Sequence, residues 1–268
     1  MPRTGIIAGS GGLPRLLADG LPEARVIAFE GTATDVPEHR LSRHRIERLG
    51  ALFDDLRAAG VDRVVLAGAM SRPALDPAVL DPVMRDLAPR ILQAMQGGDD
   101  ALLRLVVGIF EEQGFAVIGA HEALPDLTCE PGVLAGPGPS EATRADIARA
   151  EAILAALGPV DVGQGCVVSG GLCLGIETLQ GTDAMLRFVA ETPDGLRGRP
   201  GGILLKRPKP GQDLRVDMPA IGPETARAAA AAGLSGIVVA AGRTLLIDRA
   251  ALCAECDARG LFLLAERP

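Results

Sequence analysis

The sequence predicts an α/β protein with two α/β domains, and three observations support this fold class. Short apolar runs alternate with segments of helical periodicity in the first half of the chain. A segment rich in glycine and proline (TCEPGVLAGPGPSEAT) occupies residues 128–143. The same alternation then resumes in the second half. Strands that alternate with helices pack as parallel βαβ units, so each half is expected to build its own sheet covered by helices.

The apolar runs of the first half are short and end at glycine or at a polar turn, as buried strands do. They predict strands at Thr4–Ala8, Arg25–Phe29, Asp62–Ala67 and Phe115–Ile118. Helical periodicity predicts helices at Pro14–Asp19, Leu49–Ala59, Asp81–Gln96 and Asp99–Gln113. Gly60 and Gly114 follow two of these helices, and glycine commonly ends helices because it adopts a left-handed conformation. His39 and His44 flank an arginine-rich stretch that is expected to be a solvated surface segment.

The second half begins with a predicted helix over Glu141–Leu157, which Ser140 and Thr143 open with their capping chemistry. Residues Gly165–Glu177 (GCVVSGGLCLGIE) contain two β-rich runs around Ser169-Gly170-Gly171 and therefore predict a hairpin. The remaining pattern predicts strands at Gly202–Lys206, Ile237–Val239, Leu245–Ile247 and Leu261–Leu264. It predicts helices at Thr182–Ala190, Pro223–Ala232 and Arg249–Arg259.

These patterns place the domain boundaries on either side of the glycine- and proline-rich segment. Residues 1–130 are expected to form an N-terminal α/β domain, and residues 131–142 a linker. Residues 143–268 are expected to form a C-terminal α/β domain that carries catalysis.

The composition indicates a soluble globular enzyme that does not act on nucleic acid. Hydrophobic residues make up 48% of the chain, the net charge is −7, and neither Trp nor Tyr occurs. Base stacking on aromatic rings is therefore nearly lost, and an acidic chain is not attracted to nucleic acid or to anionic lipid. No apolar stretch resembles a signal peptide or reaches the roughly 18 residues that a membrane span requires, so a cytoplasmic protein is expected.

The five cysteines are scattered and odd in number, which does not fit a disulfide framework. Cys253 and Cys256 form a CxxC pair, but the partners that would complete a zinc site are missing. They are expected to be buried thiols on a helix.

A glycine-rich turn, Gly9-Ser10-Gly11-Gly12, links the first predicted strand to the first predicted helix. Small residues in such a turn allow backbone N–H groups to approach phosphate oxygens. The turn departs from the dinucleotide fingerprint because Pro14 replaces its third glycine. Glu30, at the end of the next strand, could mimic a ribose-binding acid, which keeps a nicotinamide-dependent enzyme as an alternative. A tight turn without any ligand is the other explanation.

Two heptapeptides, one in each half, resemble each other. Gly98–Arg104 (GDDALLR) and Gly181–Arg187 (GTDAMLR) are identical at five of seven positions. An aspartate near a helix start is favourable for capping and for the helix dipole, which is one explanation. The other explanation is that two helix N-termini face a shared cleft and present N–H groups to phosphate.

The segment Lys206–Gly222 (KRPKPGQDLRVDMPAIG) concentrates charged residues and prolines in one loop-like stretch. Lysine and arginine are natural contacts for a diphosphate. Asp217 is expected at the end of a semi-apolar strand, as a metal ligand or general base, or else as an ion-pair partner of Arg215 or Lys209. The chain has three histidines and no histidine cluster, so a metal would be held by oxygen ligands, which suits Mg²⁺ or Mn²⁺.

Several motifs together point to a known family. They are GIIAGSGGLP at the start, AGAMSRP (67–73), GDDALLR (98–104), EQGFAVIGAHE (112–122), DVGQGCVVSGGL (161–172), QGTDAMLRFVA (180–190) and KRPKP with DLRVDMPAIG (206–222). In these motifs, of which QGTDAMLR and RVDMPAIG are the most specific, the chain resembles the LpxI-type UDP-2,3-diacylglucosamine pyrophosphatases of lipid A synthesis. The resemblance runs in order over nearly the whole chain. It implies a two-domain α/β enzyme with its active site in the cleft between the domains.

The resemblance further implies magnesium-dependent attack of water on the α-phosphorus of UDP-2,3-diacylglucosamine, which gives UMP and 2,3-diacylglucosamine 1-phosphate. Asp217 matches the aspartate of the family's R-V-D-[LM]-P segment, which is needed for catalysis, and is expected to be the catalytic residue and a metal ligand. Mg²⁺ is the expected cofactor, with Mn²⁺ as a substitute. The expected substrate-binding residues lie in the other motifs: Gly9, Ser10, Gly11, Gly12, Asp99, Asp100, Gln164, Thr182, Asp183, Lys206 and Lys209.

The acyl chains of such a substrate require an apolar groove, and access to them would make the protein peripheral on the inner membrane. The sequence predicts no particular oligomeric state. Two alternatives remain open. One is the nicotinamide-dependent oxidoreductase, against which the absent third glycine and the charged loop at 206–222 count. The other is a non-catalytic nucleotide- or lipid-binding protein.

Overall fold

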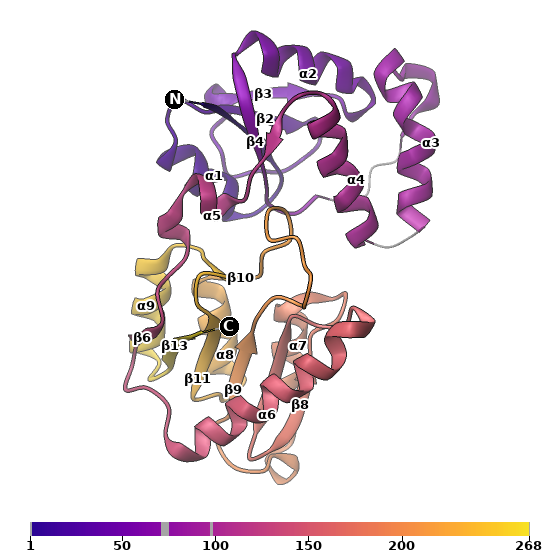
Figure 1. Cartoon of the computed structure of the whole chain (residues 1–268). Helices are drawn as coiled ribbons and strands as arrows, with labels where there is room; N and C mark the ends of the chain where they lie inside the picture. Colours follow the sequence, from indigo (N-terminus) through magenta and orange to yellow (C-terminus); the bar gives the residue numbers. More distant parts are fainter. Residues whose placement is uncertain (1, 71–74, 97–98, 268) are drawn as a thin grey trace. The chain divides into compact units, whose positions relative to one another are not determined.

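The computed structural model describes residues 2–70, 75–96 and 99–267, except for the side chains of Asp99 and Asp100. The chain divides into two compact units, which are coloured from indigo to magenta and from magenta to yellow in Figure 1. Unit 1 comprises Met1–Pro125 together with the short segment Arg215–Asp217, and unit 2 comprises Asp126–Leu214 and Met218–Pro268. Each unit contains a sheet with helices, so the predicted class of two α/β domains is confirmed.

Unit 1 is built on a parallel sheet whose strands, in the order β3-β2-β1-β4-β5, number five among the described residues. The strands are β1 (Arg3–Ala8), β2 (Arg25–Phe29), β3 (Leu41–His44), β4 (Val61–Ala67) and β5 (Ala116–Val117). The helices are α1 (Gly12–Gly20), α2 (Leu49–Ala58), α3 (Pro82–Gln96), α4 (Asp99–Glu112) and α5 (Ala120–Ala123). The strand order reverses between β1 and β4, which is the topological switch point where open α/β sheets bind ligands.

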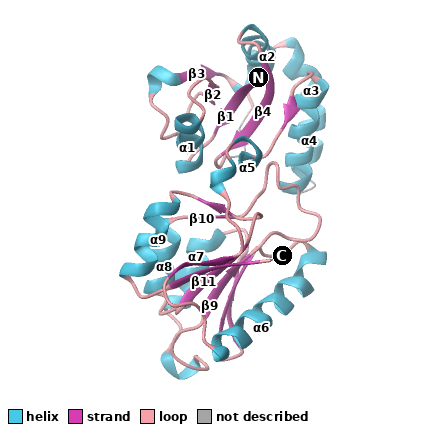
Figure 2. Cartoon of the chain, turned by 60° about the vertical axis from the view of Figure 1, so that its left-hand side comes forward, coloured by secondary structure: helices cyan, strands magenta, loops and turns pink. Residues whose placement is uncertain are grey.

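The core of unit 1 forms where α2 and α4 pack onto the sheet. Side chains on successive strand residues point to opposite faces, so Ile7 joins this core while Ile6 faces the other side. Three phenylalanines occupy the middle of the core, and the rings of Phe53 and Phe110 meet edge to face at 5.5 Å. Figure 2 shows α1 on the opposite side of the sheet from α3 and α4. Both faces are therefore covered, as a parallel sheet requires.

Arg43, Arg45 and Arg48 are exposed, as the predicted surface stretch around His39 and His44 requires, but the prediction missed strand β3 in this part of the chain. The strand pairs in parallel with β2 at the edge of the sheet. His44 is largely buried, and its Nε2 lies 2.8 Å from a carboxylate oxygen of Asp55. Arg43 on the same strand pairs with Glu38. Charged side chains are typical of edge strands because they oppose pairing with other chains, and here they concealed the strand pattern.

Unit 2 contains a mixed sheet with the strand order β6-β13-β11-β9-β7-β8 among the described residues. Its strands are β6 (Gly132–Ala135), β7 (Gly165–Ser169), β8 (Leu172–Ile176), β9 (Ile203–Lys206), β11 (Gly236–Ala240) and β13 (Phe262–Glu266). The three strands β9, β11 and β13 are parallel to one another, whereas β6, β7 and β8 each run antiparallel to a neighbour. A separate short pair joins β10 (Ala220–Ile221) to β12 (Leu245–Leu246).

Helices cover both faces of the unit 2 sheet. On one face α6 (Glu141–Leu157) packs Ile147, Ala150 and Leu154 against the strands. The other face carries α7 (Gly181–Ala190), α8 (Pro223–Ala231) and α9 (Arg249–Ala258). Figure 2 shows α6 on one side of the strands and α8 and α9 on the other. The predicted capping of α6 is confirmed, because the amide of Thr143 donates to Ser140 Oγ at 3.2 Å. The predicted hairpin is confirmed as β7 and β8.

The segment 131–142, which the sequence analysis treats as a linker, is part of the fold of unit 2. Residues 132–135 form β6, which pairs antiparallel with β13. The amide of Gly136 donates to Asp257 at 2.9 Å, and a Cβ at Gly136 would lie 2.5 Å from the carbonyl oxygen of Leu261. Gly136 is therefore required by close backbone packing. The glycines and prolines of this segment lie at the two ends of an edge strand. The chain changes units earlier, between Pro125 and Asp126.

The loop after β9 also differs from the prediction at one point. Residues 207–219 form turns and irregular backbone, and β10 begins only at Ala220. Asp217 therefore lies in a loop and not at a strand end. Three prolines between Lys206 and Ala220 remove backbone donors, which prevents this segment from pairing in a sheet.

Candidate functional site

The glycine-rich turn of unit 1 is clamped against the loop that follows β4. The amide of Gly9 donates to the carbonyl oxygen of Ala67 at 2.7 Å, and that of Ser10 donates to Ala69 at 2.8 Å. A Cβ at Gly9 would lie 2.4 Å from the carbonyl oxygen of Ala69, so only glycine allows this approach. Two of the four predicted phosphate-binding amides are thus engaged within the protein. The amides of Gly11 and Gly12 open helix α1.

This turn lies at the carboxyl ends of β1 and β4, the two strands that flank the switch point. Gly11 has φ +91°, a conformation that favours glycine, and the space that a side chain would occupy is open. A tight turn with open space beside a helix N-terminus is typical of nucleotide-binding sheets. The position therefore agrees with a ligand contact at Gly11 and Gly12.

A buried ion pair lies in unit 2 at the carboxyl end of β9. Lys206 is 5% exposed, and its Nζ lies 3.1 Å from Glu177 Oε1 and 3.2 Å from Oε2. The ammonium also contacts Thr182 Oγ1, and the Thr182 hydroxyl donates to Glu177 Oε1 at 2.9 Å. The structure thus brings together two predicted residues, Lys206 and Thr182, with Glu177, which the sequence analysis missed.

The strand register explains why these side chains meet. Gly165 of β7 is the partner of Lys206 in the sheet, and the amide of Glu177 donates to Gly165 at 2.8 Å. The amide of Arg207 donates to the carbonyl oxygen of Gln164 at 2.9 Å, so the predicted residue Gln164 lies at the same end of the sheet. Glu177 ends the hairpin five residues before Thr182. Glu177 lies in the sequence between the motifs at 161–172 and 180–190, and this position could have identified it.

A pocket of about 400 Å³ adjoins this cluster. Its walls are the starts of two helices, Gln180–Asp183 of α7 and Gly222–Thr225 of α8, together with Ala220, Ile221 and Ile247. The first N–H groups of a helix have no partner inside the helix, and the helix dipole places partial positive charge there. Two such ends at one pocket make it a strong candidate for binding an anion such as phosphate.

Carboxylates also line the pocket. Asp183 is exposed in the first turn of α7, and Glu224 at the start of α8 pairs with Arg227. A pocket that combines helix N-termini with carboxylate oxygens can accept a phosphate accompanied by a divalent cation, since such cations prefer oxygen ligands. The predicted residues Thr182 and Asp183 both belong to this pocket.

Asp217 lies in the segment Arg215–Asp217 of unit 1. Val216 packs against the hydrophobic core of unit 1, and Arg215 forms an ion pair of 2.9 Å with Glu111 on α4. The packing of Val216 and this ion pair therefore hold the two residues directly before Asp217. Three peptide units connect Asp217 to Ala220 in the pocket wall, so the chain alone limits their Cα separation to about 11 Å.

The other predicted residues are distributed as follows. Lys209 pairs with Asp161, a carboxylate outside the loop that balances its charge, and its amide donates to Gln212 Oε1 at 2.8 Å. The side chains of Asp99 and Asp100 lie outside the described residues, although α4 begins at Asp99. Part of the AGAMSRP motif, residues 71–74, also lies outside them.

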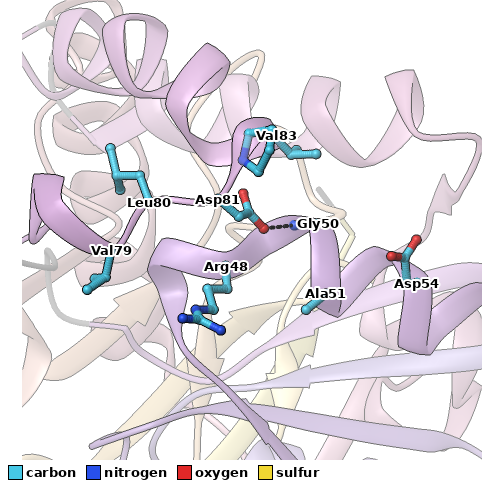
Figure 3. A pocket seen from close by; sticks show the side chains of 9 residues that line it. Arg48, Gly50, Ala51, Asp54, Val79, Leu80, Asp81 and Val83 are labelled. Carbon is cyan, nitrogen blue, oxygen red and sulfur yellow. Dashed lines mark hydrogen bonds between the residues drawn. The ribbon is translucent and has the colours of Figure 1, made fainter.

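A second pocket, of about 510 Å³, lies in unit 1 between the starts of α2 and α3 (Figure 3). Its helix starts are already capped, because Asp81 accepts bonds from the amides of Gly50 and Met84, both at 2.7 Å. None of the predicted site residues lines this pocket. It is therefore a weaker candidate for an anion than the pocket in unit 2.

Two kinds of feature are absent from residues 2–70, 75–96 and 99–267. No group of three or more His, Cys, Asp or Glu side chains is arranged to hold a metal there. In the same ranges, no helix is both long and apolar enough to cross a membrane.

The fold and the site define a two-domain α/β protein with a switch-point turn in one unit and paired helix N-termini in the other. Residues 3–127 match the family model of the LpxI N-terminal domain, and residues 130–264 match that of the LpxI C-terminal domain. The chain belongs to the LpxI family. It is 41% identical over 276 residues to a protein of Caulobacter vibrioides named UDP-2,3-diacylglucosamine pyrophosphatase LpxI, and the match covers 100% of this chain and 99% of that protein.

Proposed function

We propose that this protein hydrolyses the diphosphate of UDP-2,3-diacylglucosamine. Water attacks the α-phosphorus, and the products are UMP and 2,3-diacylglucosamine 1-phosphate. The 41% identity to the Caulobacter vibrioides protein supports the substrate, because the match covers 100% of this chain and 99% of that protein.

The observation that carries the proposal is the pocket at the starts of α7 and α8. A diphosphate brings about two negative charges, and more charge develops on the leaving phosphate during cleavage. The amides of Thr182 and Asp183 in α7 and of Glu224 and Thr225 in α8 supply fixed partial positive charge for it. Lys206 lies behind Thr182 and adds a full positive charge, which Glu177 balances in the absence of substrate.

Asp217 is the proposed catalytic residue, with a magnesium ion as the proposed cofactor and manganese as a substitute. Mg²⁺ commonly binds through one or two carboxylates and completes its shell with water and substrate phosphates. The carboxylates of Asp183 and Glu224, which both line the pocket in unit 2, fit that mode, whereas a site made entirely of protein ligands would need a cluster that the described residues do not form. A bound Mg²⁺ would neutralise charge on the phosphates. Asp217 then orients the attacking water and accepts its proton.

Apolar side chains near the pocket support an acylated substrate. Leu179, directly before the pocket residue Gln180, is 88% exposed, and Phe188 on α7 is 67% exposed. Contiguous exposed apolar surface is typical of sites that bind lipid or protein, and an acylated substrate requires such surface. We propose that they face acyl chains, and that the protein works peripherally at the cytoplasmic surface of the inner membrane. Gly11 and Gly12 are the proposed contacts to the nucleotide end.

The test is turnover of UDP-2,3-diacylglucosamine by purified protein in water enriched in oxygen-18, with magnesium or with EDTA. The proposal expects UMP that carries the label, formation only with metal, and none from Asp217→Ala. Label in the sugar phosphate would contradict attack at the α-phosphorus. No cleavage with any divalent metal would contradict the enzyme assignment. Reduction or oxidation of a nicotinamide cofactor would then favour the oxidoreductase alternative, for which the switch-point turn is the supporting feature.

A further inference from the structure

Two cysteines meet across the β7–β8 hairpin of unit 2. Cys166 on β7 is fully buried, and Cys173 on β8 is exposed. Their Sγ atoms are 3.8 Å apart. None of the contacts proposed for the substrate involves either thiol, so this pair requires a separate explanation.

The hairpin allows the two sulfur atoms to come closer. A disulfide requires an S–S distance of about 2.05 Å, so the gap must close by less than about 2 Å. Cys173 lies opposite Val168, which shares a strand face with Cys166, so both thiols project to the side covered by α6. Strand β8 is the edge of the sheet, and its register with β7 shifts between Val167 and Val168. An edge strand with irregular pairing can move without breaking a central ladder.

The environment separates the chemical roles of the two thiols. The hydrogen bond from the neighbouring Cys166 thiol lowers the pKa of Cys173 to about 6, and the positive charge of Arg149 acts in the same direction. The same hydrogen bond and burial raise the pKa of Cys166. The exposed Cys173 thiol therefore ionises more readily than the buried Cys166 thiol. A low-pKa, accessible cysteine beside a second thiol is typical of redox-sensing sites.

We propose that Cys173 is a peroxide-reactive thiol and that Cys166 resolves its oxidised form to a disulfide within the hairpin. In the first step the Cys173 thiolate attacks hydrogen peroxide, forms an S–O bond and releases hydroxide. In the second step Cys166 Sγ attacks the sulfur of the Cys173 sulfenic acid, the S–O bond breaks, and the oxygen leaves as water with the Cys166 proton. The two thiols lose two electrons, which reduce the peroxide to water. The reaction takes place on the strand that leads into Glu177, the partner of Lys206.

The remaining cysteines provide internal controls. Burial raises the pKa of Cys129 and of Cys253, and it raises the pKa of Cys256 to about 11. Cys253 is the most useful of them because it is partly exposed. It reports how an accessible thiol of this protein reacts when its environment does not favour the thiolate.

The first experiment treats reduced wild-type protein with one equivalent of hydrogen peroxide at neutral pH. Free thiols are then alkylated, and the protein is digested with a protease that cleaves at Leu172, between the two cysteines. We expect a cross-linked pair of peptides containing Cys166 and Cys173, which is lost on reduction, while Cys253 is alkylated. A cross-link between other cysteines, or Cys173 oxidised to sulfinic acid with Cys166 still alkylated, would overturn the proposal.

Variants and pH separate chemistry from folding. Cys173→Ser changes an exposed residue, and we expect Cys166 to stay reduced in it. In Cys166→Ser, whose hydroxyl can still donate to Cys173, we expect the Cys173 sulfenic acid to accumulate and to be trapped by dimedone. In wild-type protein, which does not depend on the folding of any variant, the alkylation rate of Cys173 should level off above pH 7 while that of Cys253 still rises. A Cys173 rate that rises in parallel with that of Cys253 would contradict the proposed reactivity.

Discussion

The glycine-rich turn of unit 1 and the pocket of unit 2 both lie where helices begin, but they use their hydrogen-bonding groups differently. In unit 1 the amides of Gly9 and Ser10 donate to the carbonyl oxygens of Ala67 and Ala69. In unit 2 the amides of Gly181 and Gly222 are also bonded within the protein, but the first turns of α7 and α8 that follow them line an open pocket. The pocket is also backed by Lys206, whose charge is buried and held by a single carboxylate.

This difference shows that close packing alone can require the glycines of a turn that resembles a ligand-binding motif. Gly9 is required by the close approach of Ala69, whatever ligand the turn contacts. The residues of the unit 2 pocket are less conspicuous, since the QGTD and PAIG segments read as ordinary helix starts until the fold brings them together. Function therefore follows from which helix ends remain open and not from glycine content.

The largest effect is expected for Asp217→Asn. It keeps the size of the side chain but removes its charge and its capacity to accept a proton, so turnover should fall about 10²–10⁴-fold. Steady-state formation of UMP measures this loss, with the melting temperature as a control for folding. Asp213→Asn, a substitution of the same kind in the same loop, should cost much less. Equal losses for the two variants would contradict a specific role for Asp217.

The second prediction concerns the ion pair behind the pocket. Lys206→Met leaves Glu177 buried without its cation, which should destabilise unit 2 by about 3–5 kcal/mol in urea unfolding. The double variant Lys206→Met, Glu177→Leu removes both charges and should regain much of that stability. If Lys206 acts on substrate, turnover stays low in the stable double variant. Recovery of turnover together with stability would show that the pair is structural.

The third prediction tests whether the turn of unit 1 is set by packing. Gly9→Ala places a Cβ 2.4 Å from the carbonyl oxygen of Ala69 and should destabilise unit 1 by about 2–3 kcal/mol. Gly108→Ala in α4 is the matched control, because nothing lies within 4 Å of its Cβ and alanine favours a helix by about 0.5–1 kcal/mol. Thermal unfolding should therefore move in opposite directions for the two variants. If Gly9→Ala left the melting temperature unchanged, the explanation that packing requires a glycine at this position would be contradicted.

The smallest effect is a dependence of stability on pH in unit 1. Burial opposes ionisation of Asp55, but hydrogen bonds from Arg25, His44 and Ser42 outweigh it and lower the pKa of Asp55 to about 2. A carboxyl group with a depressed pKa stabilises the fold above its unfolded pKa of 3.8 and loses this contribution as the pH falls toward 2. The contribution is no more than about 2 kcal/mol.

Urea unfolding of wild type and Asp55→Asn between pH 6 and pH 3 measures this contribution. The gap between the two proteins should be largest at pH 6 and should narrow as the pH falls below 4. Asp54→Asn serves as the control because Asp54 is 80% exposed and its ion pair with Arg57 lies at the surface. A gap that does not change with pH would mean that Asp55 contributes through packing and not through charge.

The sequence predicted most helices and central strands because their apolar periodicity is strong. Helix α6 and strand β2 have the predicted bounds, and the hairpin at 165–177 was found from its turn residues. The misses are at sheet edges. Strand β3 carries arginine and histidine, and β6 lies among glycines and prolines, so neither shows the pattern of a buried strand.

The candidate site was predictable only in part. Lys206 and Thr182 were identified through their motifs, but their common partner Glu177 depends on strand register, which no local pattern specifies. The duplicated heptapeptide offered two explanations, and the second copy does begin a helix whose start lines a pocket. The other helix start at that pocket, that of α8, lacks the heptapeptide. Only the fold, which brings the starts of α7 and α8 to one pocket, identifies α8 as part of the candidate site.

The most direct test of the central claim is to titrate the isotope-labelled protein with magnesium pyrophosphate and follow backbone amide resonances. We expect the largest shifts at Thr182, Asp183, Glu224 and Thr225, with smaller shifts or none at Gly9 and Ser10, whose amides are already bonded within the protein. Shifts confined to the unit 1 turn, with the starts of α7 and α8 unchanged, would contradict the assignment of the phosphate site to unit 2.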